Sequence, residues 1–338
     1  MEDTAIAHFD DPAAGTPPEP PTLAVLVTYH EEGALLREAL ESLLGQPDGP
    51  DVILVHDDAS TDPAARHLPD DPRITLLRAP SNVGPAVARN RLAAATTADY
   101  VHFHDADDLF LPDWSAVVRD ALLEGPDVVL TELSTMGSGG RQVTERLLGL
   151  AALERDAVDP VRHALAGAIQ PAAGTYRRTV FHAVGGYREA LWQSEDLDFH
   201  VRLLASRPSL RVIDRPLAVL RLRPEGRSRA DALGPWRNAV AAYRLLATEL
   251  DPTYRPDLAA AAARAAARLY ALGDVAAARE AFWLAEELGP PPWAGRGPLY
   301  AAVARRWGGL SAERLASAYR RLLPAALRAR LRRRTSGG

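Results

Sequence analysis

The chain has 338 residues, 47% of them hydrophobic and 25% charged, which is typical of a globular protein and suggests two domains. It contains no cysteine and no lysine, so disulfide scaffolds, thiolate zinc sites, Walker-A phosphate loops and Schiff-base enzymes are excluded. A formal net charge of −5 argues against a nucleic-acid-binding protein.

The first 21 residues differ from the rest of the chain. Residues 1–21 are acidic and rich in proline and alanine, and they lack the basic start and apolar middle of a signal peptide. We predict a disordered leader there. No apolar run elsewhere approaches the roughly 20 residues that span a bilayer. We therefore expect a cytoplasmic protein, and any membrane contact to be peripheral, at the inner face.

From residue 22 onward, short apolar runs alternate with amphipathic segments. The apolar runs predict strands at Leu23–Thr28, Val52–His56, Ile74–Leu77, Tyr100–His104 and Asp127–Leu130. Helical spacing predicts helices at Ala34–Leu44, Pro85–Ala95 and Trp114–Leu123. Such alternation predicts an α/β fold: a Rossmann-like, mostly parallel sheet flanked by helices on both faces.

Later segments change in character. Glu195–Leu204 reads as a helix, and Leu210–Ile213 and Leu217–Leu222 as strands. From about residue 231 the chain is rich in alanine, leucine and arginine, and Ala259–Leu288 predicts two antiparallel helices that turn at Gly273. One such hairpin resembles a tetratricopeptide unit, but a single copy is a weak signal, so we favour helices packed on the main domain.

The strongest local feature is the acidic run after Tyr100–His104. Asp105 and Asp107 stand two residues apart at a strand end, where both carboxylates can converge on one hard divalent cation. Such a cation neutralises a departing diphosphate. A set of acidic caps for the helix that opens near Pro112 is the alternative.

Two other segments suit a nucleotide. Asp57 and Asp58 follow the second strand, where a carboxylate accepts hydrogen bonds from a base or ribose, or else forms an Asx turn. Arg89 lies one turn into the helix that begins at Pro85, and both helix N-termini and arginine favour anions.

A further cluster precedes and opens the helix at Glu195–Leu204. Glu195 and Asp196 stand in its first turn, where acidic residues often serve only as partners of the helix dipole. Trp192, just before, is either a platform for a sugar or a core residue. His200, one turn after Asp196, either orients that carboxylate or is an ordinary helix residue. His102 is predicted to be packed and hydrogen-bonded.

In chain order these segments resemble the inverting glycosyltransferases of family 2, which have the GT-A fold. The matching text is VLVTYHEEGALLREALESLLGQ, VILVHDDASTD, NVGPAVARN, DYVHFHDADDLFLPDW and GGYREALWQSEDLDFHVRLL. The resemblance implies a GT-A glycosyltransferase domain at 22–230. A helical C-terminal region with a basic tail, at 231–338, lies outside it.

The resemblance also implies a role for each matching residue. Asp196 matches the catalytic base, and Asp105 and Asp107 match the metal motif. The implied donor-binding residues are Thr28, Tyr29, Asp57, Asp58, Arg89, Asp105 and Ala106, and the implied acceptor-side residues are Trp192 and Glu195. The family often has proline and asparagine around the tyrosine of the first strand end, where this chain has Thr28 and His30. Residues 221–228 resemble, more loosely, a basic loop near the donor phosphates.

These roles imply a metal-dependent inverting glycosyltransferase that uses Mn²⁺ or Mg²⁺. It would move a sugar from a nucleoside-diphosphate donor to a hydroxyl of a glycan, lipid or metabolite, with no nucleic acid as partner. A sugar nucleotidyltransferase is disfavoured because Tyr29–Gly33 replaces its glycine-rich basic loop. A non-catalytic carbohydrate- or partner-binding protein is disfavoured because the metal motif and Glu195-Asp196 are both present.

The C-terminal tail predicts a membrane contact. Arg314–Arg334 holds eight arginines and no acidic residue, with Leu323, Leu327 and Leu331 at four-residue steps. This pattern suits a helix lying on an anionic membrane, provided that the helix starts at Pro324. A solvated or internally packed tail is the alternative.

Overall fold

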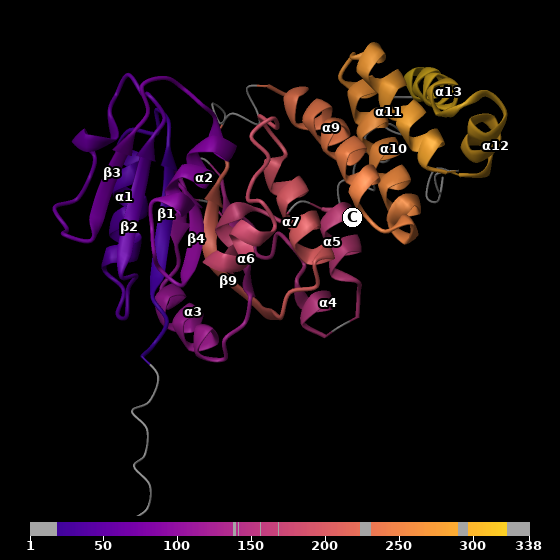
Figure 1. Cartoon of the computed structure of the whole chain (residues 1–338). Coiled ribbons are helices and arrows are strands. Elements are labelled where there is room, and N and C mark those ends of the chain that lie inside the picture. Colours follow the sequence, from indigo (N-terminus) through magenta and orange to yellow (C-terminus); the bar gives the residue numbers. More distant parts are fainter. Residues whose placement is uncertain are drawn as a thin grey trace, which may run out of the picture.

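The computed structural model describes residues 19–137, 140, 142–155, 157–167, 169–223, 231–289 and 297–322. Helices cover both faces of a twisted sheet, and further helices extend from one side of it (Figure 1). The strands are β1 (Leu23–Tyr29), β2 (Val52–Asp57), β3 (Ile74–Arg78), β4 (Tyr100–Asp105), β5 (Leu109–Phe110), β6 (Val128–Met136), β7 (Gln142–Thr144), β8 (Gly174–Arg177) and β9 (Leu210–Arg221). The helices of this part are α1 (Ala34–Leu44), α2 (Pro85–Ala94), α3 (Trp114–Leu123), α4 (Ala151–Glu154), α5 (Pro160–Ala166), α6 (Arg178–Ala183) and α7 (Glu195–Ala205).

The sheet has a parallel half and a mixed half. Its order is β3-β2-β1-β4-β8-β6-β9-β5, with β7 beside β6. Strands β3, β2, β1 and β4 run parallel, whereas β8 is antiparallel to both β4 and β6. The predicted α/β fold is confirmed, with the refinement that β5, β7 and β8, which the sequence pattern did not reveal, pair antiparallel and make the sheet mixed. The two predicted strands after residue 209 form the single strand β9, whose pairing with β6 shifts register.

Alternating side chains of the central strands pack into two hydrophobic cores, one on each face of the sheet. Val25 and Val27 of β1 pack toward α1 and α3, while Ala24 and Leu26 face the core shared with α2 and α7. His102 of β4 is fully buried, and its Nδ1 lies 3.1 Å from the Thr175 hydroxyl, as predicted for a packed, hydrogen-bonded histidine.

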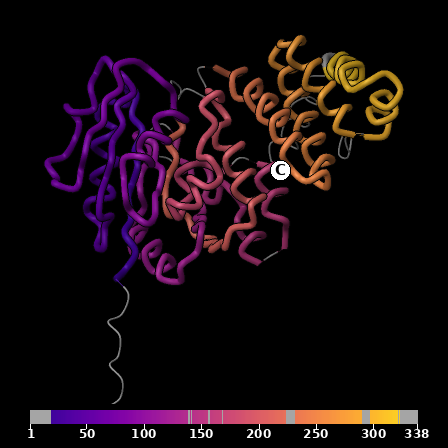
Figure 2. The backbone as a smooth tube through the Cα atoms, viewed as in Figure 1, coloured from indigo at the N-terminus to yellow at the C-terminus, as the bar shows by residue number. Residues whose placement is uncertain are grey.

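The C-terminal helices pack on the main domain, as predicted. They are α9 (Gly234–Glu249), α10 (Arg255–Ala271), α11 (Val275–Leu288), α12 (Pro298–Trp307) and α13 (Gly309–Leu322). Helix α9 contacts α7 and α10 contacts α5, so the core of the sheet continues into this region (Figure 2). The α10–α11 pair turns at Gly273, where φ is +94°. Among the helices of the described ranges, none has the length and apolar character to span a bilayer.

Candidate active site

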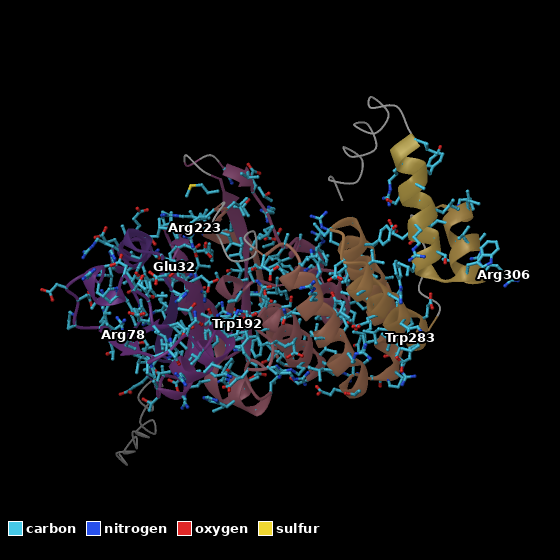
Figure 3. All side chains as sticks on the ribbon, turned by 90° about the horizontal axis from the view of Figure 1, so that it is seen from above. Glu32, Arg78, Trp192, Arg223, Trp283 and Arg306 are labelled. Carbon is cyan, nitrogen blue, oxygen red and sulfur yellow. The ribbon has the colours of Figure 1, made fainter. Side chains whose placement is uncertain are left out.

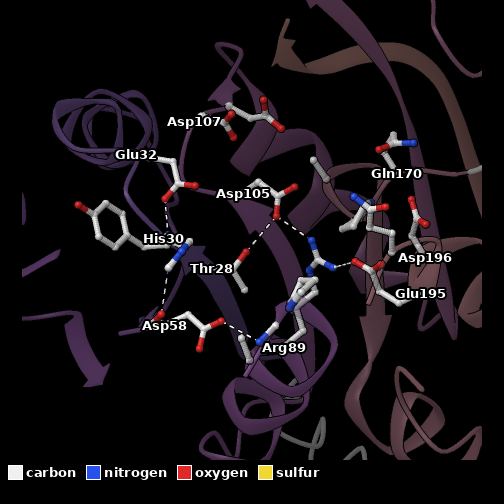
Figure 4. A pocket seen from close by; sticks show the side chains of 18 of the residues that line it. Thr28, His30, Glu32, Asp58, Arg89, Asp105, Asp107, Gln170, Glu195 and Asp196 are labelled. Atoms are coloured by element: carbon white, nitrogen blue, oxygen red, sulfur yellow. Dashed lines mark hydrogen bonds and ion pairs between the residues drawn. The ribbon is translucent and has the colours of Figure 1, made fainter. Parts of the chain in front are cut away.

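A cavity of about 840 Å³ lies at the carboxyl ends of β1, β2 and β4, beside the N-termini of α2 and α7 (Figure 4). Ligands of parallel sheets bind at this edge because the strand ends and helix N-termini converge there. The predicted site residues in its lining are Thr28, Tyr29, Asp58, Arg89, Asp105, Asp107, Trp192, Glu195 and Asp196. Asp57 and Ala106 are buried and do not line it.

The two aspartates at the end of β2 have separate roles. Asp58 faces the cavity, and its two oxygens accept the main-chain N–H groups of Val83 at 2.8 Å and Gly84 at 2.9 Å. A carboxylate has about four lone-pair positions, so acceptor capacity remains for a ligand. Asp57 accepts N–H groups from the following turn and pairs with Arg78 at 3.0 Å. The structure therefore places Asp57 in the scaffold of the turn rather than in direct reach of a donor.

The separate roles of Asp57 and Asp58 can be tested by substitution. Asp57→Asn is expected to lower the free energy of unfolding by about 1–3 kcal/mol, because buried N–H donors lose their charged acceptor, with nucleotide affinity changed less than ~3-fold. Asp58→Asn is expected to weaken nucleoside-diphosphate binding about tenfold or more. Thermal unfolding and titration calorimetry measure the two effects. Equal losses of affinity in both variants would contradict the assignment.

Thr28 and Tyr29 form part of the cavity wall beside the acidic motif. The Thr28 hydroxyl donates to Asp105 Oδ1 at 3.0 Å. The Tyr29 hydroxyl donates to the carbonyl of Asp62 at 2.6 Å, and burial raises the Tyr29 pKa to about 12. The phenol is thus tied to the segment that follows β2. Ala106, also predicted to bind the donor, instead anchors the turn through its N–H, 3.1 Å from the carbonyl of Thr28.

Both carboxylates of the acidic motif pair with arginines. Asp105 Oδ1 lies 2.8 Å from Arg89 Nη2, and Asp107 Oδ2 lies 2.7 Å from Arg223 Nη2. Burial, followed by the charge of Asp105, raises the pKa of Asp107, and Arg223 opposes this shift. Adjacent Asp108 is buried and accepts the N–H of Arg221 at 2.9 Å. The motif is therefore a crowded acidic site that attracts positive charge.

Glu32 belongs to the same acidic site, although the sequence analysis did not single it out. It follows the end of β1 and faces the cavity near Asp107 (Figure 4). Burial, aided by the charge of Asp107, raises the pKa of Glu32 to about 8, and Arg223 Nη2 lies 3.9 Å from its carboxylate. The pair Glu31-Glu32 directly after a predicted strand was the available signal.

The acidic motif fits a divalent cation that a nucleotide helps to hold. No group of three or more histidine, cysteine, aspartate or glutamate side chains within the described ranges forms a ready-made metal site. Magnesium in nucleotide sites is commonly bound through one or two carboxylates together with phosphate oxygens. Asp105 and Asp107 supply such a pair, and burial, followed by the charge of Asp105, raises the pKa of Asp107.

Arg89, which the resemblance implied as a donor-binding residue, lies buried between two carboxylates. Its guanidinium, only 3% exposed, pairs with Asp105 at 2.8 Å and with Glu195 at 2.6 Å. Burial alone would lower its pKa, but these two carboxylates raise it. Both terminal nitrogens are therefore engaged by the protein. Arg89 joins the acidic motif to α7.

Three acidic side chains begin α7, and their surroundings differ. Glu195 pairs with Arg89, whereas Asp198 is fully buried between Arg188 and Arg202, each within 2.8 Å. Asp196 lines the cavity, and its Oδ1 accepts the N–H of Leu197 at 2.8 Å. Burial, followed by the charge of Glu195, raises the pKa of Asp196 to about 7. Of the three, Asp196 is the one suited to exchange a proton near neutral pH.

His200 supports the main chain of Asp196. Its Nδ1 lies 2.7 Å from the carbonyl oxygen of Asp196, which requires the proton to be on Nδ1, and its Nε2 lies 2.6 Å from the Tyr176 hydroxyl. Burial lowers the pKa of His200 to about 4, so the ring is neutral. The contact reaches the main chain of Asp196 and not its carboxylate, so His200 supports the start of α7.

Trp192 lies over the N-terminus of α2. Its ring is 49% exposed and lines the cavity, and a Cβ on Gly84 would come within 2.8 Å of it. Gly84 has a φ of +83°, so both its backbone and this contact favour glycine. The exposed ring face is therefore part of the cavity wall, and Trp192 is not a core residue.

The family model of glycosyl transferase family 2 matches residues 24–184. This match identifies residues 24–184 as a family 2 glycosyltransferase domain. Among curated relatives of this glycosyltransferase domain are an uncharacterized glycosyltransferase of Haemophilus influenzae and the succinoglycan biosynthesis protein ExoU of Rhizobium meliloti. Both are 26% identical, over 188 and 211 residues, covering 54% and 57% of this chain. The matches cover 62% and 60% of the relatives, so the chain spans about three fifths of their length.

Solved structures share the fold of the glycosyltransferase domain and of the helices that follow it. Residues 1–349 of S. aureus TarS, in complex with UDP-GlcNAc, match with a TM-score of 0.61 and 18% identity. The match covers 89% of this chain and 92% of that one. The predicted GT-A fold is thereby confirmed, and this likeness establishes the fold alone.

Proposed function

We propose that this protein is a metal-dependent inverting glycosyltransferase that moves a sugar from a nucleoside-diphosphate donor to an acceptor hydroxyl. The observation that carries the proposal is the separation of two kinds of carboxylate in one cavity. Figure 4 displays Asp107 and Glu32 on one side, Asp196 on the other, and Asp105 and Arg89 between them.

The donor would occupy the side near β1, β2 and β4. Asp58 has acceptor capacity for ribose or base groups, and Tyr29 and Thr28 form the wall beside it. Asp105 and Asp107 would hold a divalent cation, which when bound neutralises the charge of the diphosphate. Arg223, at the rim of this acidic site, supplies a further positive charge toward the phosphates. Residues 224–228 of the predicted basic loop lie outside the described residues.

The acceptor would occupy the side near α7. Direct displacement with inversion requires a base on the sugar face opposite the leaving diphosphate, and Asp196 stands on the far side of the cavity from Asp107 (Figure 4). A pKa of about 7 lets Asp196 take the hydroxyl proton at neutral pH. The exposed ring of Trp192 offers a stacking surface to a sugar.

The test is incubation of the full chain with a panel of nucleotide sugars and Mn²⁺. Release of a nucleoside diphosphate that depends on acceptor supports the proposed transferase. Formation or consumption of inorganic pyrophosphate would point instead to a sugar nucleotidyltransferase. Binding without any turnover across donors and acceptors would favour a carbohydrate-binding protein. TarS in complex with UDP-GlcNAc makes uridine-diphosphate sugars the first donors to try.

We also propose a peripheral contact with an anionic membrane through the C-terminal helices. Helix α13 exposes Leu315, Tyr319 and Leu322 by 51%, 63% and 84%, at spacings that place them on one face. The sole acidic residue of 298–322, Glu313, is buried against the Tyr300 hydroxyl at 2.9 Å. An apolar stripe on a helix whose own acidic residue is buried suits the interface of an anionic bilayer. Most of the predicted basic tail, from residue 323, lies outside the described residues.

Vesicle co-sedimentation measures this contact. The chain shortened to end at Leu322 lacks five arginines, each of which contributes up to about 1 kcal/mol near an anionic surface. Its binding to phosphatidylserine vesicles is expected to fall at least ~10-fold relative to the full chain. Phosphatidylcholine vesicles and high salt are the controls. Equal pelleting of both chains would contradict the proposal.

A further inference from the structure

Helix α2 carries two adjacent side chains that reach from the donor half of the cavity to the segment that holds Asp196. Arg89 bonds Glu195 in the first turn of α7, and Asn90 bonds the main chain of Tyr187. The start of α2 is itself held by Asp58, which accepts the N–H groups of Val83 and Gly84. One short helix therefore contacts both the nucleotide side and the base side of the cavity.

The Arg89 bridge is buried and short. Its Nη1 lies 2.6 Å from Glu195 Oε1 and its Nη2 lies 2.8 Å from Asp105 Oδ1. The side chain is 3% exposed, and the guanidinium carbon lies 5.3 Å from the ring centroid of Tyr187. A guanidinium is planar, with its donors in a rigid fork, so it fixes the separation of the two carboxylates it binds.

Asn90 closes a second link beside the first. Its Nδ2 donates to the carbonyl of Tyr187 at 2.8 Å, and its Oδ1 accepts the N–H of Tyr187 at 2.9 Å. A Cβ on Gly186 would lie 2.6 Å from Asn90 Oδ1, and Gly186 has a φ of +60°. This two-bond link holds the turn from which the chain continues to Trp192 and α7. The contact of Arg89 with Glu195 then bears on the first residue of α7 itself.

We propose that Arg89 is a positioning residue that couples the acidic donor motif to the catalytic base, and that it is not a ligand of the donor. Through Glu195 it holds the first turn of α7, and therefore Asp196, at a fixed distance from Asp105. The guanidinium is 3% exposed and already pairs with two carboxylates, so a donor phosphate would have to enter a buried ion-pair network to reach it. The inference rests on the proposed function, because it assigns Asp196 the role of base.

The experiment compares Arg89→Lys with the matched control Arg91→Lys, which changes an exposed arginine of the same helix. Lysine keeps the charge but has a single ammonium group, which cannot hold two carboxylates in a fixed fork. We expect kcat to fall ~10- to 100-fold, because a small misplacement of the base is costly, while the Kd for a nucleoside diphosphate with Mn²⁺ changes less than ~3-fold. Arg91→Lys is expected to leave both unchanged.

A double-mutant cycle tests whether the contact between Arg89 and Glu195 is responsible for the loss of kcat. Arg89→Lys and Glu195→Gln break the same contact, so their combined loss of kcat should be smaller than the product of the separate losses. If Arg89→Lys fails to fold in thermal unfolding, Glu195→Gln alone must still show the split, with kcat reduced and Kd retained. A large rise in Kd with kcat retained would overturn the proposal and make Arg89 a donor ligand. A wild-type chain that binds no nucleoside diphosphate would instead refute the proposed function.

Discussion

Replacing Asp107 with alanine is expected to remove the Mn²⁺-dependent part of nucleoside-diphosphate affinity and to lower turnover by roughly 10²–10³-fold. Asp107 lies in an acidic site with Asp105 and Glu32, where Arg223 is its paired cation. If Asp105 and Asp107 together hold a divalent ion, one carboxylate cannot replace two, and the diphosphate then carries uncompensated charge as it leaves. Titration calorimetry with and without Mn²⁺ measures the affinity directly.

Asp113→Asn is the matched control. Asp113 lies six residues after Asp107, is 62% exposed on its side chain, and pairs with Arg215 rather than with the cavity. It has a φ of +70°, a conformation that asparagine tolerates, so the substitution should leave metal dependence and turnover near those of the unmodified chain. An Asp107→Ala variant that kept its Mn²⁺ dependence would show that the acidic run serves only as a set of turn contacts.

The clustering of the residues at the strand ends could be predicted, because the carboxyl ends of parallel strands lie at the same edge of a sheet. Thr28 ends the first apolar run, Asp58 and Asp105 follow two others, and the structure brings all three to one cavity. The strand β8 was not predictable in this way. It has only four residues, Gly174–Arg177, and it is placed between β4 and β6 by pairing with both rather than by any alternation of its own.

The contacts of Asp57, Asp58 and Arg89 differ in how far they could be predicted from the sequence. Asp57 and Asp58 differ because successive side chains near a strand end point to opposite sides, a rule that would have separated them. For Arg89 no such rule exists. A helix N-terminus and an arginine favour any anion, and the sequence does not tell a phosphate of the donor from the carboxylates of Asp105 and Glu195.

The largest loss of turnover is expected for Asp196→Asn. The substitution preserves shape and the N–H contact from Leu197 but removes basicity, so kcat should fall by roughly 10²–10⁴-fold while nucleoside-diphosphate affinity survives. In the unmodified chain kcat should rise as pH increases through about 7, because the base is active only when deprotonated and the pKa of Asp196 is about 7. Pre-steady-state and steady-state rates across pH 5–9, roughly two units either side, measure both effects.

Asp198→Asn, in the same helical turn, is expected to affect stability rather than turnover. Asp198 is fully buried and bound by Arg188 and Arg202. Its neutralisation leaves Arg202 without a charged partner, while Arg188 keeps Glu249, and should lower stability by about 3–5 kcal/mol. The folded fraction should keep its pH profile and most of its kcat. If Asp196→Asn instead retained near-normal turnover while Glu195→Gln was inactive, the base would be Glu195, and the family 2 domain would carry its proton acceptor one residue earlier than we infer.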